Sequence, residues 1–158
     1  MELYIERMKL TPKKINWFLL LKLPSAWFCG VRLNYINHTK SLASVRFKWI
    51  NQNPFKSMYF AVQAMAAELT TGALVMQSIQ NENKNISMLV AENKAEFVKK
   101  ATGKIQFECT DGKALNDAMQ LCINQKEGAT FWMKSEGKNE ANEVVSIFYF
   151  KWTLKVKS

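Results

Sequence analysis

The sequence predicts an α+β fold in which one long central helix is wrapped by an antiparallel sheet of five to six strands, with a further helix at the N-terminus. Residues 58–79 carry a single charge and repeat apolar side chains at helical spacings, which predicts the central helix. Much of the remaining chain alternates apolar and polar residues between turn residues, as strands do. At 158 residues we expect one domain, 1–158, whose residues 1–24 form an N-terminal helical arm.

The N-terminal helix is indicated by Thr11-Pro12 at its start and Pro24 beyond its end. The apolar run Ile15–Leu21 follows two lysines, as in a signal peptide, but Lys22 and Pro24 interrupt it. We therefore expect an amphipathic helix packed on the domain. Three cysteines, an odd number far apart and without a CxxC pair, favour a reduced, cytoplasmic protein with neither a disulfide framework nor a zinc site.

The strands are predicted from alternation and turn residues. Residues 31–36 and 41–50 flank a polar turn, which predicts a hairpin. The polar segment ending at Pro54 closes the second strand, and the long helix begins within the next few residues. Residues 114–123 fit a short helical insertion or an irregular extension. Further strands are expected at 86–97, 104–109, 129–134 and 144–156.

The only charge in the central helical segment is Glu68, which lies among apolar and small side chains. Burying an ionised carboxylate costs several kcal/mol unless it is paired, hydrated or functional. Two interpretations stay open: Glu68 is a functional carboxylate, or it reaches the wet rim or a buried lysine. A membrane span is not expected, because several polar residues interrupt the segment and no aromatic belt closes it.

The chain has 22 basic and 13 acidic residues, and a net charge of +9 suggests an anionic partner. The lysines are dispersed, however, and the densest group is Lys99, Lys100 and Lys104. A nucleic-acid-binding module is therefore the weakest hypothesis, whereas a phosphorylated small molecule needs only two or three such side chains. A solubilising surface is the alternative. His38 is the only histidine and lies in the hairpin turn, so no metal site is expected.

Three segments carry a resemblance to a known family: Trp27–Val31, Asn53–Gly72 and Phe97–Gly103. They resemble the hotdog fold of the acyl-CoA thioesterase superfamily, in particular its uncharacterised, DUF4442-like branch similar to phenylacetate-pathway thioesterases. The resemblance covers most of the chain from Pro24 onward, through short motifs. It implies a hydrolase that cleaves the thioester of an acyl-CoA or an acyl-carrier substrate.

The resemblance also implies roles for individual residues. Glu68 corresponds to the acidic base or nucleophile, and Asn53 orients the water or that carboxylate. The backbone amides at the helix start, around Tyr59 and Phe60, face the thioester oxygen, where a helix N-terminus stabilises an oxyanion. Many relatives have His-Gly-Gly where this chain has Tyr59, Phe60 and Ala61. These larger side chains favour a second hypothesis, a non-catalytic acyl- or lipid-binding hotdog protein.

Glu68 lies about two helical turns from Tyr59, so one chain cannot bring both to the same carbonyl. A homodimer, or a dimer of dimers, with central helices side by side places the acid of each subunit in the pocket of the other. Apolar neighbours are expected to raise the pKa of Glu68 towards neutrality. Lys99, Lys100 and the turn at Gly103 are expected to border the phosphates of CoA. CoA enters as part of the substrate, and we expect no cofactor, no metal and no nucleic acid.

Overall fold

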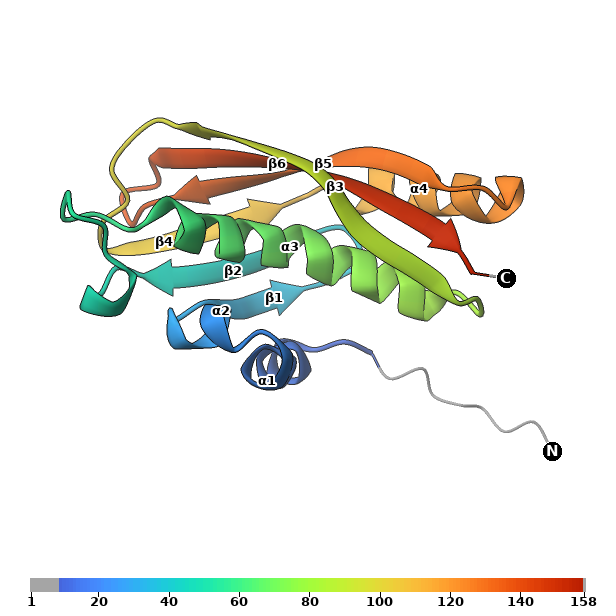
Figure 1. Cartoon of the computed structure of the whole chain (residues 1–158), viewed down its shortest axis with the longest axis horizontal. Coiled ribbons are helices and arrows are strands. Elements are labelled where there is room, and N and C mark those ends of the chain that lie inside the picture. The colour runs from blue at the N-terminus through green and yellow to red at the C-terminus, as the bar shows by residue number, and fades with distance from the viewer. Residues whose placement is uncertain (1–8, 158) are drawn as a thin grey trace.

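The computed structural model describes residues 9–157. A six-stranded antiparallel sheet covers one side of the long helix α3, and two N-terminal helices lie beside the first strands (Figure 1). In chain order the elements are α1 Pro12–Lys22, α2 Pro24–Phe28, β1 Arg32–Ile36, β2 Ser41–Arg46, the 3-10 turn η1 Trp49–Asn51, α3 Phe60–Asn81, β3 Ile86–Phe97, β4 Lys104–Cys109, α4 Gly112–Gln125, β5 Ala129–Lys138 and β6 Val144–Val156. The predicted α+β architecture is confirmed.

The order of strands in the sheet is β1-β2-β4-β5-β6-β3, and all neighbours are antiparallel. β3 therefore ends the sheet. It pairs with β6 from Ile86 opposite Val156 to Phe97 opposite Ser146, and its other edge has no partner within residues 9–157. A long free edge leaves a row of backbone N–H and C=O groups open for pairing with a second strand.

α3 packs on the sheet through small side chains. Ala66, Ala67 and Ala73 are fully buried on this face, so the strands approach the helix closely. The opposite stripe of α3 is only partly buried, and apart from one carboxylate it is small or apolar. Its members are Ala61, Ala64, Met65, Glu68 and Met76. The predicted central helix is thus confirmed, and it has a second face that the chain itself does not fully cover.

The connection between β2 and α3 differs from the prediction. β2 ends at Arg46 instead of residue 50. Phe47 N still donates to Gly103 O, one step beyond the last pair of β2 and β4, and the chain then turns through η1. α3 begins at Phe60, after the backbone N–H of Met58 has bonded to Ala101 O. Local alternation does not reveal these contacts with the segment before β4.

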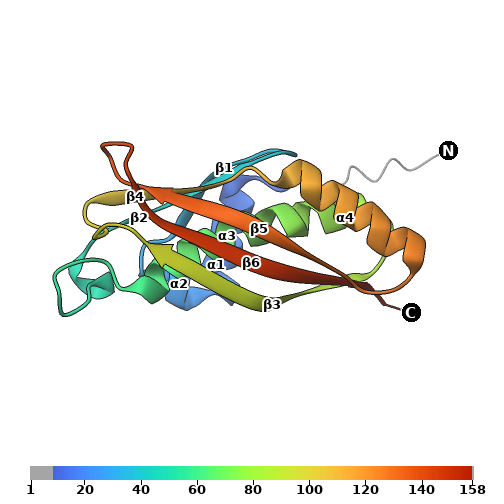
Figure 2. The ribbon, with the colours of Figure 1, turned by 90° about the horizontal axis from the view of Figure 1, so that it is seen from above.

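The segment after β4 is a helix, so of the two predicted alternatives the helical insertion is right. α4 buries Leu115, Met119 and Cys122 against β5 and β6. These residues recur at spacings of four and three, which places them on one face. Figure 2 shows α4 at the end of the molecule opposite to the start of α3. β5 continues beyond the predicted end to Lys138, because it pairs with β6 throughout and with Gln106–Glu108 of β4.

The N-terminal arm is two helices. α1 is capped by Thr11, whose Oγ1 accepts a hydrogen bond from Lys14 N, and it buries Ile15 and Leu19. Pro24 lies beyond α1, as predicted, and starts the short helix α2. The first eight residues of the predicted 1–24 arm lie outside the described residues. Across residues 9–157, no helix combines the length and the apolar character that a bilayer crossing requires.

Candidate active site on the central helix

The side chain of Glu68 lies in a cavity between α3 and the N-terminal helices. The cavity has a volume of about 330 Å³. α3 contributes Met65, Glu68 and Leu69 to its wall, and the N-terminal segment contributes Leu19, Lys22 and residues 23–26. The wall is mostly apolar, so it offers little polar protein surface that would stabilise the charge of the carboxylate.

The carboxylate of Glu68 has no ionic or hydrogen-bonded partner among residues 9–157. Lys22 lines the same cavity but forms no ion pair with it. Burial raises the pKa of Glu68 from 4.5 to about 7. The interpretation in which a buried lysine neutralises Glu68 is therefore wrong for the described chain, and the group titrates where a general base for neutral pH must.

Gly72, one turn after Glu68, makes room for this carboxylate. A Cβ atom at Gly72 would lie 3.1 Å from Oε1 of Glu68 and 3.4 Å from the ring of Trp152. The indole N–H of Trp152 donates to Thr71 Oγ1 at 3.0 Å, so the ring presents carbon to Gly72. The carboxylate thus lies over bare backbone next to an aromatic wall, and both features contribute to its desolvation.

A second, open groove lies at the start of α3. Its volume is about 510 Å³, and it combines the loop before the helix with the segment after β3. Five of the seven predicted site residues line it: Asn53, Tyr59, Phe60, Lys99 and Lys100. Gly103 is absent from the lining, and Glu68 lies in the other cavity. The fold therefore brings the predicted residues together in two separate places.

Two backbone amides at the start of α3 are free to bind an oxyanion. Tyr59 N donates to Asn51 O at 2.9 Å, and the Met58 amide is occupied in the same way. Within residues 9–157, the amides of Phe60 and Ala61 have no acceptor. Of the predicted amides only that of Phe60 stays available, and Ala61 adds a second donor that the sequence did not indicate. This pair carries the partial positive charge of the helix N-terminus.

Asn53 holds the loop in shape. Its Oδ1 accepts hydrogen bonds from Phe55 N at 2.9 Å and from Ser57 N at 3.2 Å. Its Nδ2 donates to Ser57 Oγ at 3.0 Å and to Met58 O at 3.4 Å. Because both ends of the amide are engaged, Asn53 serves this chain as a turn residue and does not touch Glu68.

The two lysines of the groove are held differently. Lys99 pairs with Glu143 at 2.7 Å at the surface, while Lys100 Nζ donates to Phe55 O at 3.3 Å. Gly103 adopts a φ of 69°, the left-handed conformation predicted for a tight turn, but it faces Glu140. Lys99 and Lys100 therefore remain candidates for a phosphate contact, and Gly103 acts on the turn that leads into β4.

An aromatic wall that the sequence did not indicate runs from the groove into the core. The ring of Phe60 lies edge-to-face with Tyr59 at 4.9 Å and with Phe97 at 6.3 Å between centroids. Phe97 continues to Phe148 at 5.6 Å. The sequence signal for Phe97 was its place at the end of β3 just before two lysines, and its contact with α3 depends on the tertiary fold.

Glu68 and the free amides lie on one helix but do not face one reacting atom. Residues 60 and 68 are about 12 Å apart along the axis at 1.5 Å per residue. The cavity and the groove also have no lining residue in common. A single chain thus supplies the two halves of a hydrolytic site without joining them.

Comparison with known proteins gives the family. The model of a domain of unknown function, DUF4442, matches residues 11–154. The chain belongs to this family. No curated protein matches the sequence.

This DUF4442 chain is also similar in fold to several solved structures. A probable thioesterase of unknown function from Pseudomonas aeruginosa is similar, with a TM-score of 0.77 and 19% identity over 93% of this chain and 97% of that one. A protein of unknown function from Chlorobaculum tepidum TLS reaches 0.80 at 19% identity, covering 95% and 99% of the two chains. A thioesterase from Haemophilus influenzae reaches 0.69 at 12% identity, covering 95% and 94%. The predicted hotdog fold is confirmed.

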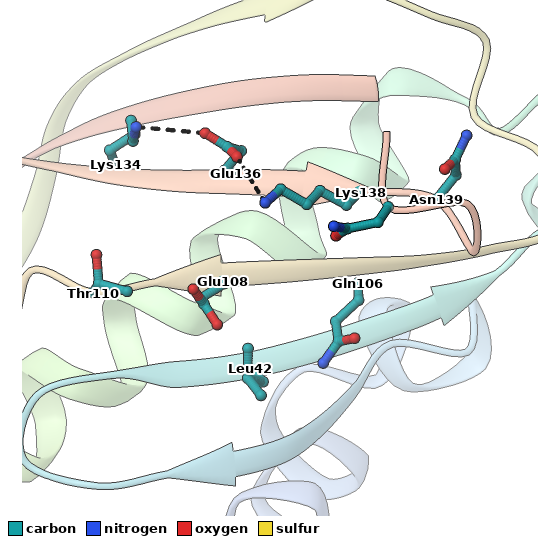
Figure 3. A pocket seen from close by; sticks show the side chains of 9 residues that line it. Leu42, Gln106, Glu108, Thr110, Lys134, Glu136, Lys138 and Asn139 are labelled. Atoms are coloured by element: carbon teal, nitrogen blue, oxygen red, sulfur yellow. Dashed lines mark hydrogen bonds and ion pairs between the residues drawn. The ribbon is translucent and has the colours of Figure 1, made fainter. Parts of the chain in front are cut away.

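A further cavity of about 350 Å³ lies on the outer face of the sheet, away from α3, and is polar (Figure 3). Glu136 on β5 forms ion pairs there with Lys134 at 3.5 Å and Lys138 at 3.4 Å. Three of its four charged side chains, Lys134, Glu136 and Lys138, are thus already paired, and its wall offers little apolar surface for an acyl chain. In residues 9–157, no three His, Cys, Asp or Glu side chains gather as a metal site would require.

Proposed function

We propose that this DUF4442 chain is a thioesterase that hydrolyses an acyl-CoA or acyl-carrier thioester, with Glu68 as its general base. The observation that carries the proposal is the desolvated carboxylate of Glu68, unpaired within the described chain, with its pKa raised to about 7. The names of similar structures, which include a thioesterase from Haemophilus influenzae, support the same class of reaction.

The chemistry follows from the protonation state of Glu68. In its ionised form the carboxylate accepts a proton from water, and the hydroxide that forms attacks the thioester carbonyl carbon. The resulting oxyanion binds the amides of Phe60 and Ala61. The C–S bond then breaks, the carboxylic acid is released, and the sulfur leaves as a thiol with the proton that Glu68 had taken.

The proposal requires a homodimer, because the base and the amides of one chain are about 12 Å apart. Two features of the described chain support such an assembly. The free edge of β3 offers a strand for antiparallel pairing, and α3 has a small, partly exposed stripe of side chains. A two-fold axis there sets the helices side by side in opposite directions, so Glu68 of each subunit approaches the Phe60 amide of the other.

We place the phosphates of CoA at Lys99 and Lys100. Both lysines line the same groove as Phe60, whose amide is free within residues 9–157. Lys99 can give up its ion pair with Glu143 for a phosphate, because the pair is exposed and water screens its charges. Lysine suits this role because it acts as a point charge and does not demand fixed geometry.

A non-catalytic acyl-binding role is the second candidate, and one observation favours it. The rings of Tyr59 and Phe60 line the groove beside the free amides and stay about half exposed, at 47% and 55%. Rings in this position suit a bound acyl chain, whereas a carbonyl that reaches the amides needs close approach to backbone. The two candidate functions use the same groove, and only the thioesterase hydrolyses the bound acyl compound.

Hydrolysis of a panel of acyl-CoAs, followed by the release of free thiol, separates these candidates. The thioesterase predicts turnover that Glu68→Gln lowers by at least about 10²-fold while acyl-CoA affinity is kept. Glu127→Gln, an exposed carboxylate after α4, is the matched control and should leave the rate unchanged. Binding without turnover in the wild type supports the acyl-binding protein. Turnover that Glu68→Gln does not slow contradicts the proposed base.

A further inference from the structure

Large apolar side chains stand in solvent at the end of the molecule where α3 begins. Trp49 is 82% exposed, Phe55 72% and Ile50 51%. They belong to η1 and to the loop 52–59, drawn in teal, which both views place at the end opposite to α4 (Figures 1 and 2). We call these three residues the aromatic tip. One exposed apolar residue needs no explanation, but a cluster of this size marks an interaction surface.

The aromatic tip is held in position by buried hydrogen bonds. Asn51 is buried, and its Nδ2 donates to Cys29 O at 2.9 Å and to Arg46 O at 2.8 Å. Its Oδ1 accepts from Lys48 N at 2.8 Å, which fixes the start of η1. Asn53 holds Phe55 in the same manner. The chain therefore fixes a backbone whose apolar side chains point outward, so binding does not require ordering a mobile loop.

Cations surround the aromatic tip. Lys48 precedes Trp49, Lys56 follows Phe55, and both are exposed. Neither ammonium group has a carboxylate partner within residues 9–157. Lys100, bonded to Phe55 O, adds a third positive charge at the same place. Apolar and aromatic groups at headgroup depth, with lysines around them, are the combination that binds the surface of an anionic bilayer.

We infer that the aromatic tip attaches this protein to anionic lipid bilayers as a peripheral protein. Trp49 and Ile50 enter the headgroup region, and Lys48 and Lys56 lie against lipid phosphates. The inference does not rest on the proposed thioesterase activity, because neither Trp49 nor Ile50 lines the groove or the cavity of Glu68. Phe55 belongs both to the aromatic tip and to the lining of the groove. Membrane attachment through the tip therefore places the groove next to the bilayer, from which an apolar substrate enters it.

The test is sedimentation of the full chain with sucrose-loaded vesicles at low salt. We expect binding to vesicles of equal parts phosphatidylcholine and phosphatidylglycerol, and far weaker binding to phosphatidylcholine alone. Trp49→Ser/Ile50→Ser should lower the partition coefficient at least about tenfold, as expected when two large apolar groups no longer leave water. Lys48→Gln/Lys56→Gln should lower it roughly fivefold per lysine on the anionic vesicles only.

The control is Leu121→Ser/Lys113→Gln on α4, which changes an exposed apolar residue and an exposed lysine at the other end of the molecule. It should bind like the wild type. No preference for anionic vesicles, or an equal loss in this control, overturns the inference. It is also overturned if Trp49→Ser/Ile50→Ser leaves vesicle binding unchanged and instead reduces the mass measured by light scattering, since the tip then joins two copies of the chain.

Discussion

Replacing Glu68 by glutamine should stabilise the protein at pH 8. The folded state raises the pKa of this carboxyl from 4.5 to about 7, because burial disfavours its charge. The folded protein therefore binds a proton more tightly than the unfolded chain. The stabilisation is complete below pH 4.5, decreases as the pH rises towards 7, and is lost above that value. At about 1.4 kcal/mol per pKa unit, the full loss is about 3 kcal/mol.

The assay is thermal and urea unfolding of the wild type and of Glu68→Gln at several pH values between 4 and 9. Other titrating groups cancel in the difference between the two proteins, so that difference reports Glu68 alone. We expect it to change by about 3 kcal/mol across this range in favour of the variant, or roughly 6 to 12 °C in melting temperature for a chain of this length.

The opposite sign would refute this reasoning. If Glu68→Gln is less stable than the wild type at pH 8, the carboxylate has a partner that stabilises its charge, because breaking such a pair costs about 3 to 5 kcal/mol. A difference that does not vary with pH shows that Glu68 is hydrated like an ordinary surface carboxyl. The rate of thioester hydrolysis provides an independent reading, since kcat/KM should rise with pH and level off above about 7.

Three further expectations follow from the same geometry. Gly72→Ala puts a Cβ 3.1 Å from Oε1 of Glu68, so kcat should fall about tenfold or more while circular dichroism shows an unchanged fold. An unchanged kcat would show that this carboxylate takes no part in the reaction. Lys99→Ala/Lys100→Ala should raise KM for acyl-CoA at low salt without changing kcat, and an equal KM at low salt would place the CoA phosphates elsewhere. Light scattering at micromolar concentration should show a dimer, and Leu89→Lys on the edge strand β3 should weaken it. A monomeric wild type contradicts the shared site.

The sequence alone predicted most of the elements and singled out Glu68 as a candidate site residue. The central helix is read from its apolar period, and β6 from the strict alternation of its residues, because side chains that pack on one face must recur at the period of the backbone. Glu68 stands out for the same reason, because burying a charged side chain among apolar residues costs free energy unless the charge is paired, hydrated or functional. Periodicity and an isolated charge are properties of a single segment, so they can be read from the sequence of that segment alone.

Only the tertiary structure decided what these residues touch. The amide of Tyr59 is occupied because Asn51 O lies opposite it, and β2 ends at Arg46 because the chain turns into η1. Gly72 and Trp152, far apart in the sequence, meet beside Glu68 and set its environment. Hydrogen bonds and desolvation depend on distance in space, and an unpaired amide or an apolar wall exists only once distant segments have packed together.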